Sequence, residues 1–156
     1  MAALTDKTPT TDDGLCETIA ITNQTAASTA VSRFVNVPSW ARYATFVVNM
    51  TSMGGTNPTF DFTVRGAYGL AVPDSADVFP LLGAGWDGIT QQTTAHVSTV
   101  HIGPDITTDD SGSATAADAY GVGAPLPKRL VYTYTTTDSA DDADYAGTIS
   151  VFFRAQ

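Results

Sequence analysis

Two histidines are the side chains of this sequence whose chemistry comes closest to catalysis or metal binding. His96 and His101 are the only histidines, and both fall in an alternating, strand-like run. Residues five apart on a strand lie on opposite faces, so these two imidazoles cannot easily share a metal ion. We interpret them as polar positions on a half-exposed strand.

Aspartates form the second group with possible chemistry. A cluster near the carboxyl terminus consists of Asp138, Asp141, Asp142 and Asp144. Such a cluster could gather around Ca²⁺, but it lacks the spaced D-x-D-x-D-G pattern with a distal glutamate. A solvated acidic turn over residues 138–144 is therefore favoured, and the Asp109-Asp110 pair is interpreted in the same way.

The motifs of the common enzyme classes do not occur in this chain. It contains no G-x-S-x-G, H-E-x-x-H, P-loop or G-x-G-x-x-G sequence. Glu17 is the only glutamate, which excludes a pair of glutamates for sugar hydrolysis but leaves aspartate pairs open. Cys16 is the only cysteine and is expected to be a small buried side chain, without a disulfide or a cysteine-based metal site. We predict no catalytic residue, no metal and no cofactor.

Two tryptophans could stack on a sugar ring if they lay on the surface. Trp40 follows Pro38-Ser39 at the start of a strand and is expected to plug the core. Trp86 lies between Gly85 and Asp87 and is a candidate for contact with a partner, although packing in the interior is the favoured interpretation.

The elements that position these residues are strands. Around a break at residues 54–58, apolar side chains alternate with polar ones along residues 43–50 and 59–65, the period of a strand with one buried face. We expect these two runs to form a central pair. Further runs predict strands at residues 16–22, 29–37, 86–90, 95–102, 128–137 and 145–154. About eight strands without an amphipathic helix predict an all-β, antiparallel, jelly-roll-like sandwich.

Two long segments and one arm complete the predicted organisation. Residues 70–85 are expected to form a long loop that packs down through its apolar members, and residues 103–127 the longest irregular piece. The polar residues 1–14 predict an amino-terminal arm, and residues 15–156 a single domain.

The net charge of the chain limits the kinds of molecule that it can bind. The formal net charge is −9 with 15% charged residues, so the surface repels nucleic acid and anionic membranes. Residues 1–14 contain no basic region followed by an apolar run, so we do not expect them to be a secretion signal. No apolar run approaches the roughly 18 residues of a membrane span. The low charged fraction fits either a surface covered in an assembly or a Thr/Ser surface kept soluble by its net charge.

The run from Met53 to Arg65 reads M-G-G-T-N-P-T-F-D-F-T-V-R. It resembles a hairpin motif of small virion proteins of tailed bacteriophages, known as head decoration, cement or minor structural proteins. The positions that match are Gly55, Thr56, Pro58, Thr59 and Asp61. The resemblance implies a jelly-roll sandwich that trimerises on the outside of an icosahedral head and clamps the major capsid protein. The protein would be made in the host cytoplasm and would act without enzymatic activity.

The arm is the expected grip on the capsid lattice. Its candidate contacts are Leu4, Thr5, Lys7, Pro9, Asp12 and Leu15. Phe152 lies on the polar side of the last strand and is a candidate for a partner surface, unless both faces of that strand are buried. A carbohydrate- or receptor-binding module of a phage tail or baseplate, using Trp86 and residues 103–127, is the alternative function.

Overall fold

A computed structural model describes residues 14–21, 28–69, 72–74, 79–83, 86–109, 118–138 and 144–156. Within this part the chain forms strands and no helix. The strands are β1 (Leu15–Ile21), β2 (Ser28–Asn36), β3 (Tyr43–Gly54), β4 (Thr59–Ala67), β5 (Ile89–Gln92), β6 (His96–Gly103), β7 (Asp118–Gly123), β8 (Arg129–Thr137) and β9 (Asp144–Arg154).

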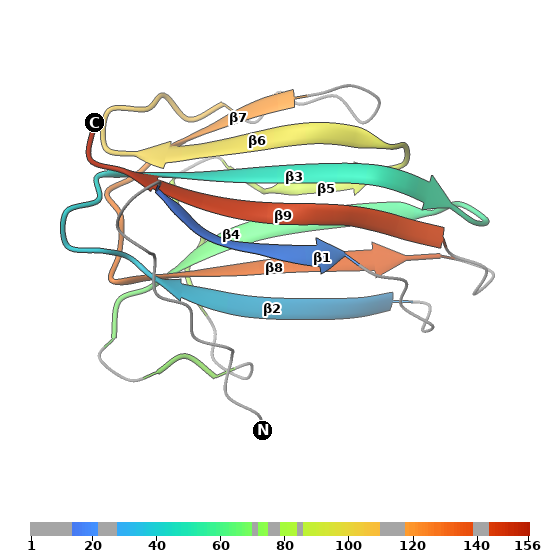
Figure 1. Cartoon of the computed structure of the whole chain (residues 1–156), viewed down its shortest axis with the longest axis horizontal. Helices are drawn as coiled ribbons and strands as arrows, with labels where there is room; N and C mark the ends of the chain where they lie inside the picture. Colours follow the sequence, from blue (N-terminus) through green and yellow to red (C-terminus); the bar gives the residue numbers. More distant parts are fainter. Residues whose placement is uncertain are drawn as a thin grey trace.

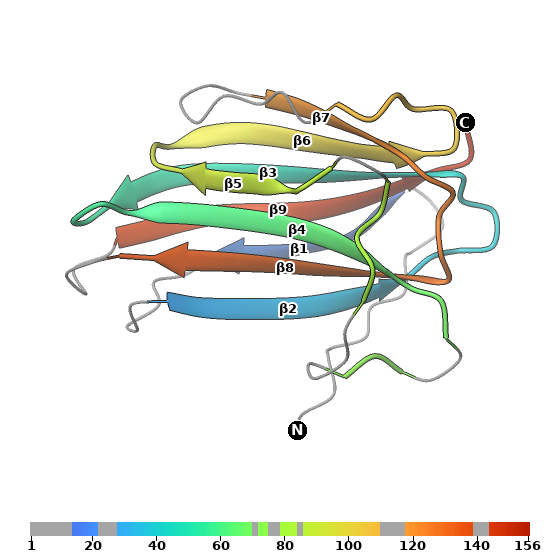
Figure 2. The ribbon, with the colours of Figure 1, turned by 180° about the vertical axis from the view of Figure 1, so that it is seen from behind.

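The strands form two sheets that face each other (Figures 1 and 2). The five-stranded sheet has the order β1-β9-β3-β6-β7, and the four-stranded sheet has the order β2-β8-β4-β5. Most consecutive strands alternate between the two sheets, which is the winding of a jelly roll. The predicted all-β sandwich is therefore confirmed. The departure is β7, which extends the larger sheet as a strand parallel to β6.

The core lies between the sheets because side chains alternate along each strand. Buried and half-buried positions alternate through β3 and β4, as the sequence pattern predicted. Phe46 of β3 meets Phe62 of β4 with ring centroids 5.7 Å apart, and Tyr132 of β8 at 5.5 Å. Glu17 is buried as well, and its carboxylate accepts a hydrogen bond from the Tyr132 hydroxyl. These aromatic contacts join the two sheets across the interior.

The expected pairing of β3 with β4 is wrong. β3 pairs with β6 and β9, whereas β4 pairs with β5 and β8, so the chain crosses between the sheets at residues 55–58. Gly55 and Asn57 make this crossing with φ values of 126° and 55°. Both flanking strands turn apolar faces to the same core. Period-two alternation reports a buried face but does not report which strand lies alongside.

Two further expectations need correction. Trp40 is not a core plug: its side chain is 40% exposed. It belongs to a turn closed by the Ala41 amide donating to the Pro38 carbonyl at 3.0 Å, and therefore lies beyond the strands. The segment 103–127 is not wholly irregular, since it contains β7. Tyr120 and Val122 are the buried residues of this short strand, and the glycines beside them weaken its sequence signal.

The connection between β4 and β5 covers part of the four-stranded sheet from outside, and Figure 2 shows it crossing in front of β4. Phe34, Ala67 and Val131 form a small buried cluster on that outer face, and Phe79 packs against it. The Arg65 guanidinium donates to the Phe79 carbonyl at 3.1 Å. The predicted packing of this connection holds for Phe79 and for Leu82, which is 1% exposed, but not for Leu81, which is 37% exposed.

Candidate functional site

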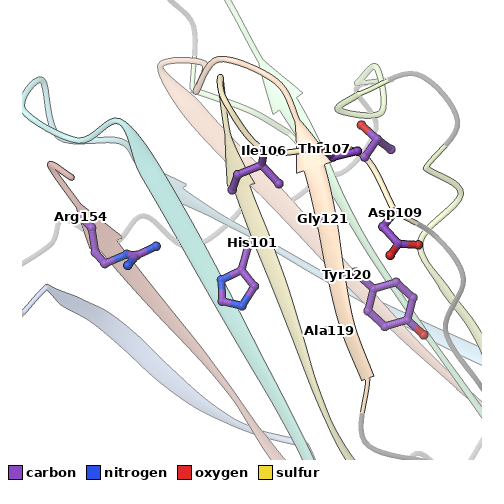
Figure 3. Close-up of a pocket in the computed structure, with 9 residues that line it drawn as sticks. His101, Ile106, Thr107, Asp109, Ala119, Tyr120, Gly121 and Arg154 are labelled. Atoms are coloured by element: carbon purple, nitrogen blue, oxygen red, sulfur yellow. The ribbon is translucent and has the colours of Figure 1, made fainter.

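An open groove lies on the outer face of the five-stranded sheet, near the carboxyl end of β9 (Figure 3). Its volume is about 510 Å³. The residues that line it are His101, Ile106, Thr107, Thr108, Asp109, Ala119, Tyr120, Gly121 and Arg154. They come from β6, β7, β9 and the segment 106–109, which follows β6.

Glycines allow the segment 106–109 to lie over β7. Asp109 and Gly121 exchange two backbone hydrogen bonds of 2.9 and 3.2 Å, and the Gly123 amide donates to the Thr108 hydroxyl at 3.0 Å. A side chain at position 121 would collide with the Thr107 carbonyl oxygen, and one at position 123 with the next carbonyl back. The groove wall therefore depends on two positions without side chains.

His101, on β6, lines the bottom of the groove next to the segment 106–109. Its Nδ1 lies 3.1 Å from the Thr45 hydroxyl of the neighbouring strand β3. Burial lowers the pKa of the imidazole from its usual value, and the nearby Arg154 guanidinium lowers it further. His101 is therefore neutral at neutral pH.

Charged side chains stand at the rim. Arg154 lies over the ring of Tyr43, with 5.8 Å from its guanidinium carbon to the ring centroid. The Tyr43 hydroxyl donates to Asp105 at 3.0 Å, and Arg42 contacts the same carboxylate at 3.5 Å. Figure 3 shows Arg154 and Asp109 on opposite sides of His101. The rim thus has a cation on one side and a carboxylate on the other.

One pair of side chains in the groove bears on covalent chemistry. A threonine hydroxyl beside an imidazole is one step of nucleophile activation, but acyl transfer also needs a group that orients the base and donors for an oxyanion. The Thr45 hydroxyl lies at the Nδ1 of His101. In the described ranges, no three His, Cys, Asp or Glu side chains are grouped to hold a metal ion.

The two histidines lie on opposite faces of β6, as predicted, but His96 is not half-exposed. It is 6% exposed, and its Nδ1 donates to the Thr94 carbonyl at 2.7 Å. The ring of Phe60 lies 6.0 Å away between centroids. His96 is a core residue and has no place in the groove.

The residues predicted for partner contact separate into two groups. Trp86 is 1% exposed in the core, which agrees with the packing interpretation and leaves no surface for a sugar ring or a partner. Phe152 is half-buried on the outer face of β9, where it pairs across the ladder with Leu15 and Thr45. Of the two, only Phe152 is available on the surface.

The remaining predicted contacts fall mostly outside the described residues. Leu4, Thr5, Lys7, Pro9 and Asp12 belong to residues 1–13, and Leu15 is described only as the first residue of β1.

The acidic turn is partly outside as well, since Asp141 and Asp142 are not described. Asp138 is 3% exposed, so the expectation of a fully solvated turn is wrong for this residue. It lies directly after β8, where the strand still faces the core.

Sequence reasoning missed Arg154 and Asp109 as members of one groove. They are far apart in the chain and meet only through the order of strands β9, β3, β6 and β7. The Gly121-Val122-Gly123 sequence was the available signal, because glycine at alternate strand positions marks a close approach of backbone.

Comparisons with protein-family models, with curated proteins and with solved structures found no match to this chain. Among the described residues no helix is long and apolar enough to cross a membrane.

Proposed function

We propose that this chain is a non-enzymatic structural protein of a virion, a decoration or cement protein on the capsid exterior. In this role it binds the major capsid protein as a homotrimer and stabilises the head. Its partners are proteins rather than nucleic acid or membrane, in keeping with the net charge of −9.

The observation that carries the proposal is the position of the large aromatic side chains in the fold. The aromatic residues Phe46, Phe60, Phe62 and Tyr132 are buried between the sheets. Outside, no described segment crosses the middle of the larger sheet (Figure 1), and the groove lies near one end of this face. Flat faces with few charges suit contact with another protein surface, whereas small ligands favour concave sites that enclose them.

The resemblance of residues 53–65 to phage decoration proteins supports the same class. Its matching positions Gly55, Thr56 and Pro58 lie in the crossing between the sheets, at one end of the sandwich. The carbohydrate-binding alternative loses its stacking residue because Trp86 is buried.

The test is binding to heads that lack the protein. Purified chain would be mixed with such particles of the parent virus, and bound protein would be measured by co-sedimentation and electron microscopy. We expect a fixed ratio to the major capsid protein and an increased resistance of the heads to heat. Absence of binding at micromolar concentration would overturn the proposal.

A variant that lacks residues 2–14 tests the arm as the grip. We expect it to keep the oligomeric state of the full chain but to lose coating of the heads. Thr90→Glu, an exposed change on the opposite sheet, is the matched control and should coat heads normally.

A further inference from the structure

The outer face of the five-stranded sheet has a composition unlike the rest of this acidic chain. Its outward residues across the strands are Thr18, Ala20, Thr45, Val47, Asn49, Val97, Thr99, His101, Ala119, Thr148, Ser150 and Phe152. We call this set the neutral face, because none of its members is Asp, Glu, Lys or Arg. The charged residues Arg154 and Asp144 lie at its two ends.

The neutral face carries apolar side chains that the described chain does not cover. Val97 is 44% exposed, and Val47 and Phe152 are half-buried. In Figure 1 no described segment crosses in front of the middle of β9, β3 and β6. On the other sheet, in contrast, Phe79 packs over the outward Phe34 and Val131. One sheet is thus covered by a described segment of the chain, whereas no described segment covers the middle of the other.

Four polar side chains of the neutral face are already partnered in pairs within the sheet. The Thr18 and Ser150 hydroxyls lie 2.9 Å apart, and Thr45 lies 3.1 Å from the Nδ1 of His101. Burying a polar group costs little when its hydrogen bond is kept and much when the bond is lost. The face can therefore be removed from water without leaving these hydroxyls unsatisfied.

We propose that the neutral face is the surface through which copies of this chain contact each other. This inference rests on the homo-oligomeric part of the proposed function and names its surface. A second copy is the occupant that the charge distribution favours. With a net charge of −9, most other contacts between copies would bring carboxylates together, whereas two neutral faces meet without desolvating a charge.

The size of the neutral face is sufficient for a specific contact. Five strands spaced by about 4.8 Å and about seven residues of roughly 3.3 Å each cover on the order of 500 Å² in projection. The accessible area of protruding side chains exceeds this projection, and a standard interface takes about 800 Å² from each partner.

The experiment measures the mass of the purified full chain in solution. Light scattering after size exclusion should give a multiple of 16.3 kDa. Association should strengthen between low and high NaCl, because salt screens the repulsion of two acidic copies and leaves apolar burial intact. Association that weakens with salt would point to a contact between charged ends and would overturn the proposal.

Val97→Glu and Ala119→Glu place a carboxylate at exposed positions of the neutral face. We expect each to weaken self-association by at least about tenfold. Thr90→Glu, an equal charge change at an exposed position of the other sheet, should leave it unchanged. Unchanged association in both neutral-face variants, with unfolding curves like wild type, would overturn the choice of surface.

The outcomes separate this inference from the proposed function. A wild-type chain that stays monomeric at high concentration removes the self-contact, even if it coats heads. A wild-type oligomer that fails to bind heads removes the capsid role and leaves the self-contact standing.

Discussion

The two sheets differ in what covers the apolar side chains on their outer faces. On the four-stranded sheet, the connection between β4 and β5 returns over Phe34 and Val131. It is held by the Arg65 guanidinium, which donates to the Phe79 carbonyl, and by the Gly66 amide, which donates to the Pro80 carbonyl. On the five-stranded sheet, the segment 106–109 reaches only the end of the face, above β7. A sheet exterior that is covered contributes to folding, whereas one that is left open is available for contact.

The largest expected difference between the faces concerns folding stability. Phe34→Ala removes a ring that is 1% exposed, and we expect a loss of about 3 kcal/mol or more in the free energy of unfolding. Phe152→Ala removes a half-buried ring from the open face, and we expect about 1 kcal/mol. Urea unfolding at low protein concentration, with unchanged m-values, measures both. Equal losses would mean that the two faces are covered to the same degree.

An intermediate effect is expected where the five-stranded sheet is covered. Gly121→Ala places a methyl group against the Thr107 carbonyl oxygen, so the segment 106–109 must move. We expect a loss of about 1–3 kcal/mol and faster hydrogen exchange in that segment. Gly69→Ala is the matched control, since nothing lies within 4 Å of the added methyl group. If hydrogen exchange in residues 106–109 stays slow, the missing side chain at position 121 is not what allows this segment to pack against β7.

The smallest effect is a pH dependence from His101. Its pKa is lowered in the fold from the ordinary value of 6.5, first by burial and then by Arg154. The unfolded chain therefore binds more protons, so the full stability is present above about pH 6.5 and declines as the pH falls through the lower folded pKa. Thermal unfolding between pH 7.5 and 5 measures this decline.

His101→Gln should flatten the decline over this pH range. Arg154→Gln should reduce it, because removing the guanidinium raises the pKa of His101 toward its ordinary value. The groups that face the imidazole are Thr45 on β3, Arg154 on β9 and Asp109 across the groove. An equal decline in His101→Gln and wild type would assign the effect to another group.

Local alternation was sufficient to predict most strands. Residues 43–50, 59–65, 128–137 and 145–154 fall within or close to β3, β4, β8 and β9, because their apolar positions recur every second residue. The predicted strand at residues 86–90 instead appears as β5, Ile89–Gln92, since Trp86 enters the core before the strand begins. β7 was missed because its buried residues Tyr120 and Val122 stand between glycines and a small residue.

The groove could not be assembled from sequence. Arg154, His101 and Asp109 come from separate segments, and only the ladder order brings β9, β3 and β6 side by side. The exposure of Trp40 could likewise not be predicted from neighbouring residues, since it depends on how the connection between β2 and β3 leaves the end of the sandwich.

The sequence by itself determined the class of the fold, the absence of common catalytic motifs and the acidic character of the chain. The fold class follows from the alternation of side chains, which can be recognised within a few residues. The missing motifs and the acidic character follow from the order and the composition of residues along the whole chain. Only the tertiary structure decided that β3 and β4 lie in opposite sheets and that, among the described residues, a connection covers the exterior of one sheet but not the middle of the other. The reason is that strand partners and covering loops are selected by long-range packing, in which residues distant in the chain compete for the same face.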